Sequence, residues 1–239
     1  MMAREKTVGI IGGMGPEATI DLMRRVVEAT PAHDDADHIR MVVDNDPKVP
    51  SRIEALIEGT GESPAPHIIG MARGLEQQGA DFLVIACNTA HHYHAEVAAA
   101  VGVPVLNMVE LAASHITDRH PAVARVGLLA SSALRVVGLY EPAFDRRGLE
   151  VVYPSRGHQC SVMDLIRAVK AGNPTDELVE AGNEAAAALV AGGAQCILIA
   201  CTELSVIADR LHVGAPMYDA SDIMANMILR IARPESHSG

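Results

Sequence analysis

Two stretches of this chain repeat each other, and this repeat is the feature that most limits its possible folds. Residues 79–87, Gly-Ala-Asp-Phe-Leu-Val-Ile-Ala-Cys, align without gaps on residues 193–201, Gly-Ala-Gln-Cys-Ile-Leu-Ile-Ala-Cys. Each stretch is a continuous apolar run that ends at a cysteine, Cys87 in the first and Cys201 in the second. Runs of this kind are typical of buried parallel strands. The repeat therefore predicts two similar α/β units, each with a thiol at the carboxyl end of a strand, where open α/β sheets bind ligands.

Other landmarks recur at nearly the same spacing. Val126-Gly127-Leu128-Leu129 echoes Val8-Gly9-Ile10-Ile11, and Pro216 echoes Pro104. In the first half this pattern predicts strands over 7–11, 38–44, 82–87 and 103–107, and helices from 16 to about 29, over 68–78 and over 91–100. Right-handed crossovers then give each half a short parallel sheet flanked by helices.

The predicted fold class is therefore α/β, with two similar domains related by internal pseudo-duplication and the active site in the cleft between them. We expect the first domain to comprise residues 1–113 together with a C-terminal helix within 219–239, and the second to comprise residues 114–218.

Composition excludes several kinds of partner. The 239 residues are 49% hydrophobic but only 3% aromatic, so the core must be built from Ala, Val, Ile, Leu and Met. The formal net charge of −11 argues against nucleic acid and against an anionic membrane surface as partners. No apolar run is long enough to suggest a membrane span. The four cysteines lack CxxC spacing, which fits a reducing compartment and predicts a cytoplasmic protein.

The paired cysteines indicate the chemistry. A thiol next to the opening of a helix is expected to have a lowered pKa, because free amides and the helix dipole stabilise the thiolate. Cys87 and Cys201 would then face each other across the cleft as two equivalent acid/base groups. Stereoinversion needs this arrangement: a thiolate removes a proton from one face of a carbon, and a thiol on the opposite face returns one.

Other uses of cysteine fit the sequence less well. A nucleophilic thiol of amidase type needs a histidine base, and although His91, His92 and His94 lie near Cys87, nothing comparable follows Cys201. The acidic and histidine-containing segment 33–38 is interpreted as a solvated loop, so neither a metal nor a cofactor is expected.

The segment that follows the first strand matches G-x-G-x-x-[GA], the dinucleotide-binding pattern. Pro16 removes an amide where a pyrophosphate would bind, so this turn is more simply a receptor for a substrate carboxylate. Arg52, on a proline-rich loop, and Lys170, at an expected helix end, are the candidate cations for such a substrate.

Three motifs of this chain strongly resemble the aspartate/glutamate racemase family, whose members racemise amino acids without pyridoxal phosphate. They are Gly12-Gly13-Met14-Gly15-Pro16-Glu17-Ala18-Thr19, Cys87-Asn88-Thr89-Ala90-His91 and Cys201-Thr202-Glu203. The resemblance extends over essentially the whole chain. It implies a two-domain α/β fold, a cleft that holds a small acidic amino acid, and a homodimer.

The resemblance also implies roles for individual residues. By similarity, Cys87 and Cys201 are the two catalytic acid/bases, and Glu203 is an orienting partner. The residues that would contact substrate by the same similarity are Met14, Arg52, Asn88, Thr89, Lys170 and Thr202. Because both cysteines are kept, the chain resembles the members that act on both enantiomers.

The sequence departs from the family pattern at two places. Ser131-Ser132-Ala133-Leu134 replaces a threonine-rich turn, and Asp46 adds a carboxylate that we expect near the cleft. The preferred amino acid therefore stays open between aspartate, glutamate and a less acidic one. Isomerisation or decarboxylation of a small dicarboxylate, and simple ligand binding, are the competing interpretations.

Overall fold

The first half of the chain forms a parallel sheet, and Cys87 lies two residues beyond one of its edge strands. In the computed structural model, which describes residues 4–234, the strands β1 (Val8–Gly12), β2 (Met41–Asn45) and β3 (Phe82–Ile85) lie in the order β2-β1-β3. Val8 is paired with Met41 on one side and with Phe82 on the other, and both pairings are parallel. β1 and β3 are buried throughout, as their apolar sequences predict.

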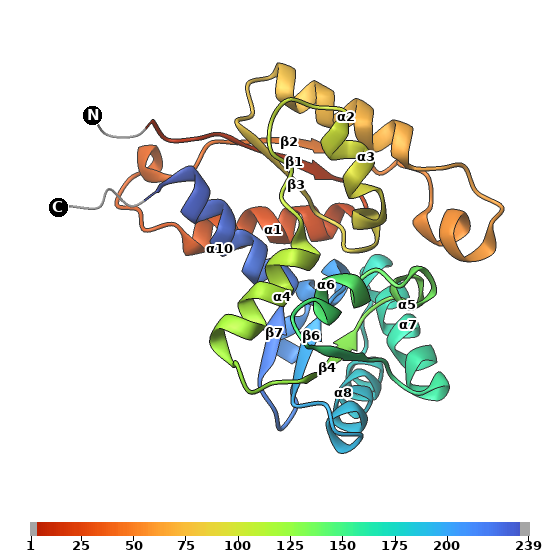
Figure 1. Cartoon of the computed structure of the whole chain (residues 1–239). Helices are drawn as coiled ribbons and strands as arrows, with labels where there is room; N and C mark the ends of the chain where they lie inside the picture. Colours follow the sequence, from red (N-terminus) through yellow and green to blue (C-terminus); the bar gives the residue numbers. More distant parts are fainter. Residues whose placement is uncertain (1–3, 235–239) are drawn as a thin grey trace.

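Helices and turns of the first half connect and cover these strands. They are α1 (Pro16–Ala29), a 3-10 turn η1 (Asp35–Asp37), a π-helical turn η2 (Glu54–Glu58), α2 (Ala65–Gln77), a 3-10 turn η3 (Thr89–Tyr93) and α3 (His94–Ala99). Figure 1 shows α2 and α3 on one face of this sheet and α1 on the other, toward the second half.

The second half repeats this arrangement and extends it by one strand. Its sheet has the order β5-β4-β6-β7, all parallel, with β4 (Arg125–Leu129), β5 (Glu150–Val152), β6 (Cys196–Ile199) and β7 (Met217–Asp219). Its helices are α4 (Met108–Arg119), α5 (Ser132–Val137), α6 (Glu141–Asp145), α7 (Arg156–Lys170), α8 (Asp176–Ala191), α9 (Thr202–Val206), the 3-10 turn η4 (Ala208–Arg210) and α10 (Ala220–Ala232). The prediction of an α/β chain with two similar units is confirmed.

Two local predictions were wrong. Residues 103–107 do not form a strand, because Val105 makes only a single bridge, with Leu83 of β3. Asn107 already caps α4, since its side chain accepts hydrogen bonds from the amides of Val109 and Glu110. The expected single helix over 91–100 instead opens as the 3-10 turn η3 before α3 begins.

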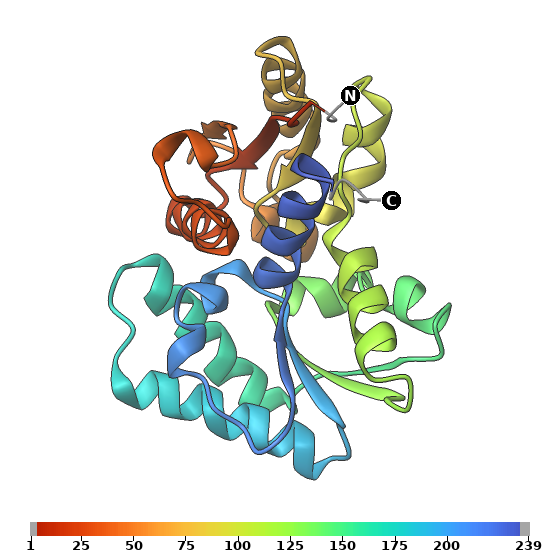
Figure 2. The ribbon, with the colours of Figure 1, turned by 90° about the vertical axis from the view of Figure 1, so that its left-hand side faces the viewer.

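One hydrophobic cluster connects the two halves. It joins the inner face of the first sheet, at Val8 and Ile10, to the inner face of the second, at Val126 and Leu198, with α1, α4, α6 and α10 contributing between them. α10 packs against α1, α4 and β7, and Figure 2 shows it running between the two halves. The C-terminal helix therefore returns to the first half.

The predicted domain boundaries are not decided by these contacts. The division at residue 113 falls inside α4, and residues 1–3 and 235–239 of the predicted first domain lie outside the described residues. Within residues 4–234, no helix is long and apolar enough to cross a membrane.

Candidate active site

The two repeat cysteines reach the same cavity. Cys87 follows β3 by two residues and Cys201 follows β6 by two, so each lies just beyond the carboxyl end of its strand. Both line a cavity of about 110 Å³, and each is 5% exposed. Residues 114 positions apart in the sequence are thus brought to one small space between the two halves.

Most of the predicted site residues line this cavity. Met14, Arg52, Thr89, Lys170 and Glu203 are among its walls. A second cavity, of about 360 Å³, lies toward the start of α1 and shares Arg52, Lys170 and Glu203 with the first. These three charged side chains therefore stand where the two cavities meet.

A glycine-rich turn forms one wall and is fixed by Thr19. The Thr19 hydroxyl accepts a hydrogen bond from the Gly13 amide at 3.0 Å and donates one to the Gly15 carbonyl at 3.2 Å. Gly13 has φ +86°, and a Cβ there would lie 2.1 Å from the Asp46 carbonyl oxygen. Only glycine fits this position, and the turn places Met14 against the cavity.

Arg52 connects this turn to the proline loop. Its guanidinium donates to the carbonyls of Val49 at 3.2 Å, Pro50 at 2.8 Å and Met14 at 3.2 Å. Three of its five N–H groups are thereby used on the backbone, which leaves two for another acceptor. Arg52 is half-buried and faces both cavities.

Cys201 belongs to a chain of three ionisable groups. Its thiol donates to Glu203 Oε2 at 3.1 Å, and the other oxygen of Glu203 forms an ion pair with Lys170 Nζ at 3.2 Å. Burial, together with the Glu203 carboxylate, raises the pKa of Cys201 well above its usual range. The expected lowering of this pKa was wrong, because burial and a neighbouring carboxylate outweigh both the Lys170 cation and the amides of the short helix α9.

Lys170 is the cation of this group. Burial lowers its pKa, but the negative charges of Glu203 and of the two thiolates, when these form, raise it by more, so the net shift is upward. Lys170 is the last residue of α7, as the sequence predicted. It remains protonated at neutral pH and is placed to stabilise negative charge in the cavity.

Cys87 has a histidine neighbour that contacts its backbone. His91 Nδ1 donates to the Cys87 carbonyl oxygen at 2.8 Å. Complete burial lowers the pKa of His91 to about 4, so its ring is neutral at pH 7. His91 therefore orients the end of β3, and its ring is bonded to the carbonyl of Cys87 and not to the thiol.

Asn88 and Thr202 are not among the residues that line the cavity. Asn88 Oδ1 accepts a hydrogen bond from the Tyr140 hydroxyl, which connects the two halves. Within residues 4–234, however, Asn88 Nδ2 and Thr202 Oγ1 are buried and have no hydrogen-bond partner. Buried polar atoms of this kind are costly unless something binds them.

Several residues of the cavity were not predicted as site residues. They are Ser51, Ile53, Ser131, Met163, Ile166 and Arg167. Ser131 accepts or donates a hydrogen bond with Thr89 at 3.2 Å across the two halves. The sequence marks the turn that begins at Ser131 as a departure from the family pattern that faces the cleft, but does not place Ser131 itself among the site residues. The cavity residues on α7, which are Met163, Ile166 and Arg167, gave no sequence signal of a site, since their segment shows only an ordinary amphipathic helix.

Two acidic features do not contribute to the cavity. Asp46 was expected near the cleft, but it pairs with His67 at 2.7 Å and accepts the Lys48 amide instead. In the segment 33–38, Asp37 accepts the amides of His33 and Asp34 and so closes the turn η1. Among the residues that the structure describes, no group of three or more His, Cys, Asp or Glu side chains is arranged to hold a metal ion.

The fold, with a cavity at the strand ends of two similar units, is shared with a family of racemases. The chain belongs to the Asp/Glu/hydantoin racemase family, whose model matches residues 11–228, and the resemblance seen in the sequence is thereby confirmed. It is 30% identical over 222 residues to the broad-specificity amino-acid racemase RacX of Bacillus subtilis, covering 91% of this chain and 94% of that protein.

Solved structures agree with this assignment. The aspartate racemase of Picrophilus torridus superposes with a TM-score of 0.84 at 34% identity, over 95% of this chain and 94% of that one. The glutamate racemase isoform RacE1 of Bacillus anthracis superposes with a TM-score of 0.71 at 14% identity, over 98% and 84%. The second similarity concerns the fold alone.

Proposed function

We propose that this enzyme racemises an acidic amino acid, aspartate or glutamate, without a cofactor, with Cys87 and Cys201 as its two acid/bases. The observation that carries the proposal is that both thiols line one cavity of about 110 Å³ between the two repeated units. Similarity to an aspartate racemase and to a broad-specificity amino-acid racemase supports racemisation.

The reaction requires one thiolate and one thiol on opposite faces of the substrate. The thiolate removes the α-proton and leaves a planar carbanion, and the opposite thiol then gives its proton to the other face. After each turnover the two sulfur atoms have exchanged protonation states, so the enzyme is ready for the opposite enantiomer. The equivalent positions of the cysteines in the repeat match this requirement.

In the resting enzyme we assign the proton to Cys201. Its thiol donates to Glu203 Oε2, and burial together with that carboxylate raises its pKa. Cys87 then acts as the first base. The Lys170 ammonium, whose pKa is raised in part by the negative charge of either thiolate, stabilises the anionic sulfur and the carbanion.

Charge and hydrogen bonding favour an acidic substrate. Arg52 and Lys170 line the cavity in a protein of net charge −11, and Arg52 has two N–H groups that the backbone carbonyls do not use, so a cation is present where a dicarboxylate would bind. Arg167 also lines the cavity but pairs with Asp164 at 2.9 Å, and Lys170 pairs with Glu203. We expect Asn88 Nδ2, Thr202 Oγ1 and the Thr89 hydroxyl to bind the α-carboxylate and α-amino groups. Thr89 lines the cavity, and within residues 4–234 the buried Asn88 Nδ2 and Thr202 Oγ1 have no hydrogen-bond partner, which supports this part of the proposal. Because these two atoms do not line the cavity, their contact with substrate requires a shift of the cavity wall.

A racemase of a less acidic amino acid is the second candidate. Met14, Ile53, Met163 and Ile166 give part of the cavity an apolar wall. The similarity to a racemase named for broad specificity favours a wider substrate range. The two candidates differ in the side chain accepted and share the two-thiol mechanism.

Proton NMR in deuterated water tests the proposal. The purified protein, with no cofactor added, is mixed with the L or D enantiomer of aspartate, glutamate, alanine or methionine. We expect loss of the α-proton signal and formation of the opposite enantiomer, fastest with an acidic substrate. Faster turnover of alanine or methionine would support the second candidate. Failure of all four would contradict both, and maleate and arylmalonates would then test the dicarboxylate reactions.

Two further expectations concern the whole protein. We propose that the chain is a homodimer, which light scattering of the purified protein would measure as a mass of twice 25.2 kDa. We also propose a cytoplasmic location, which the four free thiols in the described residues support.

A further inference from the structure

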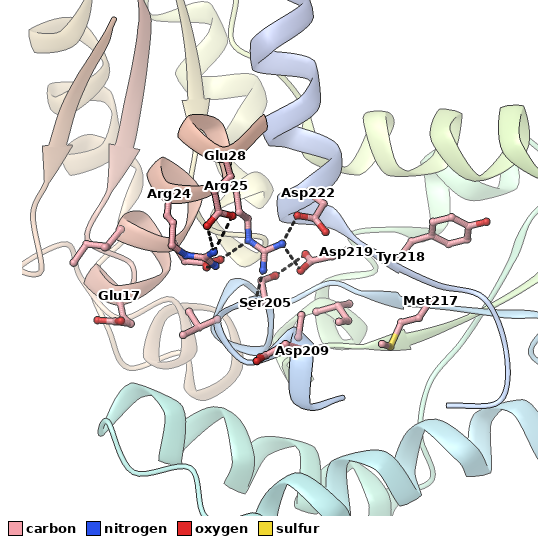
Figure 3. A pocket seen from close by; sticks show the side chains of 15 residues that line it. Glu17, Arg24, Arg25, Glu28, Ser205, Asp209, Met217, Tyr218, Asp219 and Asp222 are labelled. Atoms are coloured by element: carbon pink, nitrogen blue, oxygen red, sulfur yellow. Dashed lines mark hydrogen bonds and ion pairs between the residues drawn. The ribbon is translucent and has the colours of Figure 1, made fainter. Parts of the chain in front are cut away.

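We propose that Arg25 is a positioning residue that fixes α9, and through it the thiol of Cys201, against the first half of the chain. The inference rests on the proposed role of Cys201 as an acid/base. Figure 3 shows the contacts that carry it, on the side of the molecule where α1 meets the start of α10.

Arg25 joins elements from both halves. It lies on α1 and is only 9% exposed. Its Nε donates to Asp21 at 2.6 Å on its own helix, while Nη1 pairs with Asp219 at 3.1 Å and with Asp222. Its Nη2 donates to the carbonyl oxygen of Ser205 on α9. One guanidinium thus binds the end of β7, the start of α10 and the last turn of α9 to the first half.

The contact to Ser205 leads directly to Cys201. α9 has five residues, begins immediately after Cys201, and is too short to be stable without tertiary contacts. The Ser205 amide donates to the Cys201 carbonyl at 3.1 Å. The Ser205 carbonyl belongs to the last turn, whose carbonyl groups lack their regular helical partners. The Ile207 amide is shared between the Leu204 and Ser205 carbonyls, and Arg25 adds a cationic donor to that of Ser205.

A second connection reinforces the first. The Ser205 hydroxyl donates to Asp219 Oδ1 at 2.6 Å and accepts from the Ser221 hydroxyl at 3.0 Å, and all three side chains are buried. Asp219 therefore holds Arg25 with one oxygen and Ser205 with the other. The backbone and the side chain of Ser205 are both tied to the same charged pair.

The charges make this arrangement rigid. Burial lowers the pKa of Arg25, but Asp219, Asp21 and Asp222 raise it by more, so Arg25 stays charged. Burial raises the pKa of Asp219 to about 6, which still leaves it ionised at neutral pH. Removing one member of a buried ion pair leaves the other uncompensated, so the network resists loosening of α9.

The cavity beside this network, of about 750 Å³, does not by itself indicate a ligand. Its acidic side chains include Asp21, Asp219 and Asp222, which already pair with Arg25, and Arg24 pairs with Asp21 and Glu28. The side chains of this network therefore satisfy one another's charges, and a role in holding α9 accounts for them without a bound molecule. Glu17 and Asp209 also line the cavity, have no ion pair among the described residues and lie outside the network.

Arg25→Met tests the proposal, with Arg24→Met as its matched control. Arg24 is the neighbouring residue of α1, and among the described residues it pairs only with Asp21 and Glu28 on the same helix. Iodoacetamide labelling is followed by mass spectrometry for each cysteine of the same chain, because Cys160 is exposed and Cys87 and Cys201 are equally buried. This readout does not require the racemase reaction.

In Arg25→Met we expect Cys201 to be alkylated at least about threefold faster relative to Cys87, with the rate at Cys160 unchanged. Arg24→Met should label like the unmodified protein. General loosening of the fold would raise labelling of Cys87 and Cys201 together. An unchanged ratio in a folded Arg25→Met protein would overturn the proposal, whereas a changed ratio without racemisation would contradict only the proposed function.

Kinetics give the second readout. A displaced acid/base should lower kcat by about tenfold to a hundredfold, since an error of about 1 Å in a catalytic group has effects of this size, and should leave KM within about threefold. Arg25→Lys should restore part of kcat. If Arg25→Met does not fold, Asp222→Asn, which removes one anionic partner of Arg25 and no bond to α9, should raise the Cys201 to Cys87 labelling ratio in the same direction. An unchanged ratio in that variant would contradict the proposal.

Discussion

At the scale of single residues, the two thiols of this site are equivalent in the sequence but not in their surroundings. Cys201 donates to a carboxylate that is itself paired with a lysine, whereas Cys87 has a neutral histidine bonded to its carbonyl. In the proposed mechanism the repeat supplies two acid/bases, and the residues around each cysteine set which thiol holds the proton at rest. Glu203, which accepts a hydrogen bond from the Cys201 thiol, is the neighbour that distinguishes the two thiols.

The two-base mechanism predicts opposite defects for the two cysteine variants. Cys87→Ser and Cys201→Ser should each lower racemisation by at least about a hundredfold, since a serine hydroxyl cannot replace a thiolate base. In deuterated water each variant should still exchange the α-proton of one enantiomer, and the two variants should differ in which one. Cys160→Ser, at an exposed position, serves as the control. Near-normal turnover by either variant would contradict the two-base mechanism.

Glu203→Gln should lower the pKa of the Cys201 thiol, because the carboxylate that disfavours the thiolate is removed while the thiol stays buried. The measurement is the rate of Cys201 alkylation as a function of pH. Glu96→Gln removes an equal charge from an exposed position of α3 and should leave the profile unchanged. A Glu203→Gln profile that coincides with the unmodified one would show that Glu203 does not control this thiol.

At the scale of elements, the strands and the first helix could be predicted well from sequence because their signals are local. The continuous apolar runs gave β1, β3, β4 and β6, and Pro16 marked the start of α1. Residues 103–107 could not be predicted correctly, because whether they pair depends on where α4 is capped by Asn107.

The location of the site could be predicted from the repeat. The properties of its side chains that depend on tertiary contacts could not. The shared cavity of Cys87 and Cys201 follows from equivalent strand ends. The raised pKa of Cys201 does not follow from the sequence, because it depends on burial of the thiol and on the position of the Glu203 side chain. Arg25 gave no sequence signal at all, since its partners on β7 and α10 lie almost two hundred residues away in the chain.

The glycine turn after β1 depends on one backbone position. Gly13→Ala should cost more than about 3 kcal/mol of unfolding free energy, because φ is +86° and the added Cβ meets the Asp46 backbone. Gly79→Ala is the matched control: its φ is +89°, but nothing lies within 4 Å of the added Cβ, so the cost should be about 1–2 kcal/mol. Urea unfolding measures both. Equal costs would show that the contact with Asp46 can relax.

The turn η3 makes stability depend on pH through His91. Burial lowers the pKa of His91 from 6.5 to about 4, so between these values the unfolded chain binds a proton that the folded chain does not. The stabilisation is complete above about pH 6.5 and is lost as the pH falls toward about 4, by about 3 kcal/mol in total.

His91→Asn should remove this loss of stability at low pH. The side-chain amide of the new asparagine can still donate to the Cys87 carbonyl, but it does not titrate. Asp219 titrates in the same range with the opposite sign, because its pKa is raised. The quantity to compare is therefore the difference in unfolding free energy between the two proteins at pH 7 and at pH 4.5. A difference that does not change with pH would contradict the assignment of a buried neutral His91.

At the scale of the whole molecule, the continuous core predicts that the two halves unfold together. One hydrophobic cluster includes β1 from the first half and β4 and β6 from the second, and Arg25 adds charged contacts across the same boundary. Neither half can keep its inner face buried once the other unfolds, so separate unfolding would expose that cluster to water. We therefore expect the two similar units to unfold as one cooperative structure.

Urea unfolding followed by far-ultraviolet circular dichroism and by tyrosine fluorescence tests this. The chain has no tryptophan, and Tyr140 is fully buried in the shared cluster and donates to Asn88 of the other half. We expect one transition with the same midpoint by both probes. Arg25→Met should lower that midpoint without splitting the transition, because the apolar core remains. Two separate transitions in the unmodified protein would show instead that the repeat units are independent domains joined at the active site.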